Sequence, residues 1–164
     1  MESRREINMR DEDTEFVSFV ERFRAECYSY QENEQGRGLE LSFIQCAYNR
    51  TDLVDIGDLS TVYISGQVGT NIINIEGFRY DDDDHSLTLA TSAFDNFRRE
   101  KCLTSTEAKQ IANRVRAFFK LIREDKKNKI ISGLNIDFST QEYDMIDQIS
   151  EAGAEGIERV TVLI

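Results

Sequence analysis

The sequence of 164 residues contains no proline and no tryptophan, a single histidine and three cysteines. Any Ser–His or Cys–His catalytic pair would have to use His85, which has no nucleophile near it in the sequence. We therefore predict a structural or exposed role for this histidine. The cysteines Cys27, Cys46 and Cys102 are odd in number and form neither a CxxC pair nor a zinc-ligand spacing, so they are predicted to be reduced and mostly buried thiols. Reduced thiols are typical of a cytoplasmic protein.

The sequence also lacks long apolar runs and an excess of basic residues. No stretch approaches the roughly 20 apolar residues of a membrane span, and no apolar core of a signal peptide follows the N-terminus. Twenty basic residues against 31 acidic ones give a net charge of −11. This balance argues against a general nucleic-acid coat or a membrane-surface protein, although it leaves room for a local basic patch. No glycine-rich phosphate loop is present.

The first third of the chain predicts helices. Residues 1–12 are polar and are expected to form a flexible arm before a single domain over residues 13–164. A helical stripe follows from Thr14, at spacings of three and four residues. Its apolar members are Phe16, Phe19, Val20, Phe23, Cys27 and Tyr30. Residues 31–38 predict a loop, and a second helix is expected from Leu39 to about Asp52.

The middle of the chain predicts strands. Residues 60–65 are rich in β-branched and aromatic residues, and residues 71–80 and 86–93 are predicted to pair as an antiparallel hairpin. The four aspartates from Asp81 to Asp84 lie between these two runs. Their carboxylates suit a hard cation, but the ligand alternation of an EF-hand is missing. A solvated acidic turn is therefore the favoured interpretation.

The last third predicts helices and a closing strand. Thr104 and Glu107 have the spacing of a capping box, and the helix that it begins has apolar positions at Ile111, Val115, Phe118 and Ile122. Residues 129–138 are predicted as a further strand, residues 140–152 as a short amphipathic helix and residues 160–164 as a final strand. The resulting fold class is α/β, with a mixed central sheet flanked by helices.

The chain stops inside its last apolar run, at Ile164. A free carboxylate at the end of a buried strand would place a charge beside the core, which is unfavourable. We therefore expect the sequence to be the N-terminal part of a longer protein, and the remainder of that protein to be its first partner.

One stretch of this acidic chain is cationic. Lys109, Arg116, Lys120, Arg123 and Lys127 fall near one face of a helix if that helix continues through the whole stretch. Such a stripe could face nucleic-acid phosphates. A solvated outer helix face has the same pattern and is the favoured reading.

Three short motifs resemble those of a known family. Residues 75–81 (Ile-Glu-Gly-Phe-Arg-Tyr-Asp) lead into an acidic turn, then Leu87-Thr88-Leu89 and Ala93-Phe94-Asp95. This order resembles the N-terminal domain of abortive-infection phage-resistance (AIPR) proteins, in which an Ile-Asp-Gly-aromatic strand precedes an acidic turn and a Leu-x-Leu strand. The capped helix near Thr104 and the closing strand at residues 157–160 are also similar, so that the likeness covers residues 37–164.

The resemblance implies a restriction-endonuclease-like core, preceded here by an N-terminal helix. Active members of this fold use an aspartate on one strand and a Glu/Gln-x-Lys motif on the next. The carboxylates hold magnesium, and the lysine orients water and offsets charge on the phosphate. Here the three positions correspond to Glu76, Thr91 and Ala93. Only Glu76 retains a metal-binding carboxylate, so that two of the three positions are altered.

Other residues could compensate for these changes. Glu26 or Glu40, on the preceding helices, would supply a further carboxylate, although both also fit ordinary solvated helix positions; Lys101 would supply the displaced lysine. The favoured hypothesis is a phage-defence module with a nuclease fold that is inactive in isolation, needs no cofactor and acts in binding or regulation.

The alternatives are an active magnesium-dependent nuclease with a displaced lysine and an unrelated α/β protein-interaction domain. Nucleic acid and a second copy of the chain stay open as partners, and a membrane is not expected.

Overall fold

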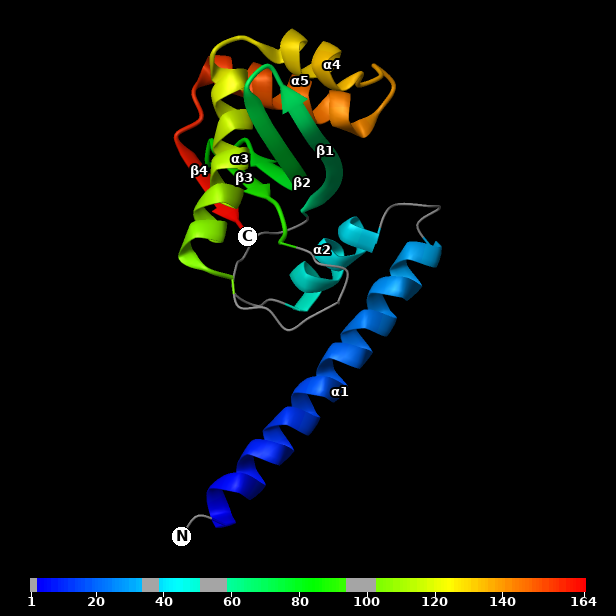
Figure 1. Ribbon diagram of the computed structural model, residues 1–164. Coiled ribbons are helices and arrows are strands. Elements are labelled where there is room, and N and C mark those ends of the chain that lie inside the picture. Colours follow the sequence, from blue (N-terminus) through cyan, green and yellow to red (C-terminus); the bar gives the residue numbers. More distant parts are fainter. Residues whose placement is uncertain (1–2, 34–38, 51–58, 94–102) are drawn as a thin grey trace.

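The computed structural model describes residues 3–33, 39–50, 59–93 and 103–164. Within these ranges the protein is an α/β structure with five helices and a four-stranded mixed sheet (Figure 1). The elements in chain order are α1 (Ser3–Asn33), α2 (Leu39–Arg50), β1 (Ser60–Val68), β2 (Asn71–Asp81), β3 (Ser86–Ala90), α3 (Ser105–Arg123), α4 (Lys127–Leu134), α5 (Gln141–Glu155) and β4 (Arg159–Leu163). The predicted fold class is confirmed.

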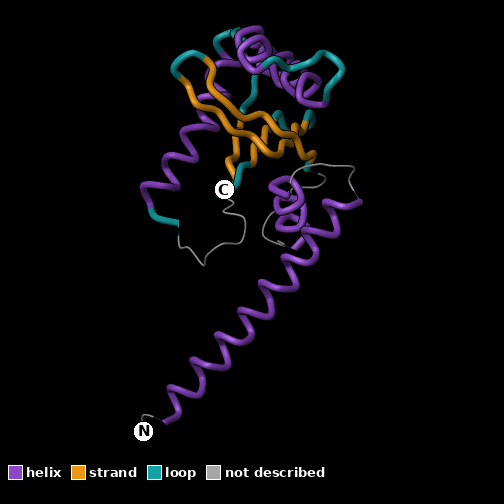
Figure 2. Tube along the Cα trace, turned by 45° about the vertical axis from the view of Figure 1, so that its right-hand side comes forward, coloured by secondary structure: helices purple, strands orange, loops and turns teal. Residues whose placement is uncertain are grey.

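The N-terminal helix is longer than predicted. It already begins at Ser3, so that it includes most of the segment expected to be a flexible arm. The apolar spacing from Thr14 could not reveal this extension, because the preceding residues are charged and carry no stripe. Only the C-terminal part of α1 packs on α2, and the rest of α1 extends away from the sheet (Figures 1 and 2).

The sheet has the strand order β1-β2-β3-β4. Strands β1, β2 and β3 are antiparallel neighbours, and β4 pairs in parallel with β3. The predicted hairpin is thus confirmed, with Tyr80 opposite Leu87 and Gly77 opposite Ala90. The parallel pair β3–β4 needs a crossover, which here contains α3, α4 and α5.

Helix α3 supplies much of the core. Its capping box is present as predicted, since the Thr104 hydroxyl accepts from the Glu107 N–H and the Glu107 carboxylate accepts from the Thr104 N–H. The four residues predicted to form its apolar stripe are all buried. Three of them, Val115, Phe118 and Ile122, belong to the main hydrophobic cluster. That cluster also contains the strand residues Ile73, Ile75, Leu87 and Leu89 and the α5 residues Met145, Ile146 and Ile149.

The predicted strand at residues 129–138 is wrong, because Lys127–Leu134 form helix α4. Ile130 and Ile131 are buried in the core, and a short apolar run of this kind fits a strand or a buried helix equally well. The helix ends at Asn135, whose φ of 53° is left-handed. Asparagine adopts this conformation more readily than most residues.

A smaller apolar cluster joins α1 to α2. It contains Phe23, Cys27 and Cys46, with Phe43 packed against it. Both cysteines are free and buried, which confirms the prediction for these two; Cys102 lies outside the described residues. Among the described residues, no helix is sufficiently long and apolar to cross a membrane.

Candidate functional site

Glu76 lies on β2 and is almost completely buried, with 3% of its surface exposed. Its Oε1 accepts a hydrogen bond from Asn74 Nδ2 at 3.0 Å. The same amide nitrogen donates to Thr91 Oγ1 at 2.9 Å, and Thr91 is also 3% exposed. The structure therefore brings together two of the three positions predicted from the sequence, and one amide bridges them.

The sheet register accounts for this convergence. Gly77 pairs with Ala90 in the antiparallel ladder, so that the next positions, Glu76 and Thr91, lie on adjacent strands at the same level. Asn74 precedes Glu76 by two residues and shares its side of β2, because side chains alternate along a strand. The Thr91 N–H donates to Leu163 O at 3.0 Å, which fixes this end of β3 against β4.

Gly77 makes room for a side chain rather than for a ligand. A Cβ at this position would lie 2.7 Å from Leu59 Cδ2 and 3.3 Å from Ala90 Cβ. Leu59 thus fills the space at Gly77, on the face of β2 opposite to the Glu76 side chain.

Helix α2 contributes Tyr48 to the electrostatics of the site. Burial raises the pKa of Tyr48 to about 12, and the negative charge of Glu76 adds to the shift. The phenol is therefore protonated throughout the physiological range. It is a neutral neighbour of Glu76 and not a second anionic ligand.

The donor atoms around Glu76 do not fit magnesium. Mg²⁺ requires a nearly octahedral set of oxygen ligands, whereas the Asn74 amide places an N–H donor between the carboxylate and the Thr91 hydroxyl. A carboxylate only accepts hydrogen bonds, which sets the orientation of the amide. In the described part of the chain, no three His, Cys, Asp or Glu residues are grouped so as to hold a metal ion.

The remaining predicted positions do not complete the site. Ala93 is exposed and carries no functional group. Glu26 forms an ion pair with Arg50, with Arg50 Nε 3.0 Å from Glu26 Oε2, and thereby links α1 to α2. Lys101 and the side chain of Glu40 lie outside the described residues, so that their suggested roles stay predictions.

The acidic turn is bound to neighbouring basic residues. Asp81 Oδ2 pairs with Arg79 at 2.8 Å, and Asp84 Oδ2 lies 3.4 Å from Arg159 at the start of β4. The carbonyl of His85 accepts hydrogen bonds from the N–H groups of Glu158 and Arg159. The turn and its histidine thus anchor β4 beside β3, which is a structural role.

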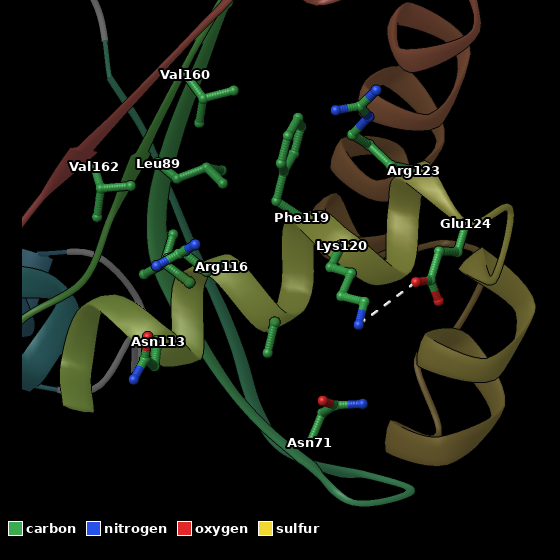
Figure 3. Close-up of a pocket in the computed structure, with 12 residues that line it drawn as sticks. Asn71, Leu89, Asn113, Arg116, Phe119, Lys120, Arg123, Glu124, Val160 and Val162 are labelled. Atoms are coloured by element: carbon green, nitrogen blue, oxygen red, sulfur yellow. Dashed lines mark ion pairs between the residues drawn. The ribbon is translucent and has the colours of Figure 1, made fainter. Parts of the chain in front are cut away.

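The cationic residues do not form one helical stripe. Helix α3 ends at Arg123 and the chain turns through Asp125, with φ of 52°. Lys127 belongs to α4 and pairs with Asp147 of α5 at 2.5 Å. The prediction that Lys127 shares a helix face with the other four cations was wrong, because it assumed one uninterrupted helix. Arg116, Lys120 and Arg123 do line one groove beside α3 (Figure 3).

Sequence reasoning missed Asn74 and Tyr48. The period of two along β2 could have indicated Asn74, because it places residues 74 and 76 on one side of the strand. No comparable signal exists for Tyr48, whose position depends on how α2 packs against β1 and β2.

One comparison with known proteins found a match. The family model of the abortive infection phage resistance protein N-terminal domain matches residues 43–164. The comparisons with curated proteins and with solved structures found no match. The matched range includes β1 to β4, α3 to α5 and the Glu76 site.

Proposed function

This chain belongs to the family of abortive infection phage resistance protein N-terminal domains, and from that premise we propose that it is a nuclease-fold module that does not cut and acts in a phage-defence protein by binding. The order of elements supports the nuclease fold. A helix precedes the antiparallel β1–β3 unit, and α3 leads by way of α4 and α5 to β4, which is parallel to β3. The resemblance implies a helix before a β-hairpin and a helix–strand pair that completes the sheet, and this order of elements is consistent with it.

The hydrogen bonds of Asn74 are the main observation that supports the proposed loss of nuclease activity. In an active site of this class a cation joins the carboxylate of one strand to the acidic group of the next. Here an uncharged amide joins Glu76 to Thr91 at 3.0 Å and 2.9 Å. The amide donates to Glu76 Oε1 and to Thr91 Oγ1 without a positive ion, and it contributes neither Lewis acidity nor an activated water.

The second loss concerns the charge that develops on phosphate. The position implied for the catalytic lysine is Ala93, which has no cation to offer. Loss of one electrostatic contributor of this kind typically costs about 10²- to 10³-fold in rate. Two such losses bring the expected rate of phosphodiester cleavage close to background.

Incubation of the chain with plasmid, single-stranded DNA and RNA, in magnesium and then in manganese, tests this proposal. Glu76→Ala is the matched control, because any activity of this site requires the carboxylate. We expect the two proteins to give the same background and magnesium titration calorimetry to give only weak surface association. Cleavage that survives purification and disappears in Glu76→Ala would show that the domain is an active nuclease.

A further inference from the structure

A groove of about 710 Å³ lies between α3 and the strands β3 and β4 (Figure 3). Leu89, Val160 and Val162 of the strands and Phe119 of α3 are its main apolar residues. Val160 is 37% exposed although it belongs to the sheet. An apolar sheet face is normally covered by a helix. No described element covers the sheet at Val160.

The rim of the groove is positively charged. Arg116, Lys120 and Arg123 line it, and Glu124 is its only acidic lining residue in the described structure. Lys120 pairs with Glu124 at 3.7 Å, an exposed contact that contributes little. Within the described ranges, Arg116 and Arg123 have no ion-pair or hydrogen-bond partner, so that two cations beside an apolar floor remain available in a chain of net charge −11.

Helix α1 presents a surface of the opposite charge. Residues 11–21 contain five acidic residues and no basic one. In the same segment Phe16, Val17 and Phe19 are 46%, 50% and 43% exposed. The N-terminal part of α1 extends away from the rest of the chain (Figures 1 and 2). Phe19 keeps its exposed side although its ring stacks on Phe23 and lies 5.7 Å from the Arg50 guanidinium of α2. An acidic helix with exposed apolar side chains is an unusual solvent-facing element and indicates a binding partner.

We propose that the groove beside α3 binds residues 11–21 of α1 from a second copy of this chain. Phe16 and Phe19 would enter the apolar floor at Val160 and Val162, and the acidic residues of α1 would face Arg116 and Arg123. Exchange of α1 between two copies forms two identical contacts, so that the assembly closes as a symmetric dimer.

The dimensions of the two surfaces agree. Arg116 and Arg123 are two helical turns apart, about 10 Å along the axis of α3, and residues 11–21 span about 15 Å of α1 on the same scale. A helix laid beside α3 would extend the helical layer over β3 and β4. Burial of the phenylalanines supplies affinity, and the charges supply orientation and register.

The groove fits this helix better than it fits nucleic acid. Its floor is mostly aliphatic and offers little surface on which bases could stack. The inference does not depend on whether the domain cuts nucleic acid, because the groove shares no lining residue with the Glu76 site.

Sedimentation velocity of the full 164-residue chain over a range of concentrations tests the dimer, with circular dichroism to confirm the folding of each variant. The groove variant is Arg116→Glu/Arg123→Glu. Its matched control, Lys109→Glu/Arg114→Glu, makes the same charge change on exposed positions of α3 that do not line the groove. The α1 variant is Glu12→Arg/Glu15→Arg, which reverses the charges one turn before Phe16 and Phe19.

We expect a concentration-dependent dimer for the wild type and for the control, and dimerisation weakened at least about tenfold in either reversed variant. An equimolar mixture of the two reversed variants should form a heterodimer, because both of its contacts again join opposite charges. A wild type that stays monomeric at every concentration would overturn the proposal, and so would dimers that persist in both variants. Nucleic-acid binding lost in the groove variant without any dimer would also overturn it.

Discussion

The amide of Asn74 should be the feature that keeps the Glu76 site independent of metal ions. Asn74→Asp keeps the size of this side chain but replaces the N–H donor by a second carboxylate, at a contact that is now 3.0 Å. It removes a hydrogen bond to a charged group, worth about 1.5–3 kcal/mol. It adds a repulsion that reaches about 5.5 kcal/mol for two unit charges 3 Å apart at an effective dielectric constant of 20.

Protonation of one carboxyl will relieve part of that repulsion, so we expect a net loss of about 3 kcal/mol in the free energy of unfolding. For a domain of this size each kcal/mol lowers Tm by roughly 2–4 °C. Tm should therefore fall by about 6–12 °C in a metal-free buffer, measured by differential scanning calorimetry.

The same substitution should make stability depend on divalent cations. The new carboxylate at position 74 and that of Glu76 supply oxygen ligands that Mg²⁺ and Mn²⁺ prefer. A cation at 100 times its Kd stabilises the folded state by about 2.7 kcal/mol, which recovers most of the loss. Asn74→Ala is the control, because it removes the donor without adding a ligand and should be destabilised without rescue. A wild type that is stabilised by magnesium as much as Asn74→Asp would refute the argument.

Three further outcomes concern stability. Thr104→Ala removes the hydroxyl of the α3 capping box and should lower the free energy of unfolding by about 1 kcal/mol in a urea titration, whereas Ser105→Ala at the neighbouring exposed position should change it little. Phe118→Ala empties a fully buried position and should cost about 3–5 kcal/mol in the same assay; a loss below 1 kcal/mol would contradict the packing described above. Burial, reinforced by Cys46, raises the pKa of the Cys27 thiol from 9.0 to about 12. The Cys27 thiol therefore ionises at a lower pH in the unfolded state than in the folded state. The free energy of unfolding should be constant below pH 9 and decrease from pH 9 to pH 12. This decrease should be shallower in Cys27→Ala.

Local patterns in the sequence predicted most of the elements because those elements depend on neighbouring residues. The hairpin follows from the alternation around Leu87 and Leu89, and α3 follows from its cap and its four apolar positions. Residues 129–138 were mispredicted because a run with two isoleucines is satisfied by either regular structure. The boundary between α3 and α4 depends on the left-handed residue Asp125, which no periodicity reveals.

The candidate site could be predicted only in part. The resemblance indicated Glu76 and Thr91, and the register then placed them together. The bridging role of Asn74 was not evident, because a polar residue on a strand is equally consistent with solvent exposure. The groove beside α3 combines β3, β4 and α3. Contacts between such distant segments are set by packing and leave no short motif.

The parallel pairing of β4 has a consequence for the order in which the sheet assembles. The hairpin of β2 and β3 closes over a few residues, whereas the contact between Asp84 and Arg159 spans 75 positions. The entropy of closing that larger loop must be offset by the crossover helices before β4 can dock. None of the β4 side chains is fully buried, so few apolar contacts hold β4 on the sheet. β4 should therefore join the sheet last and leave it first, and its amide protons should exchange with solvent well ahead of those in β2.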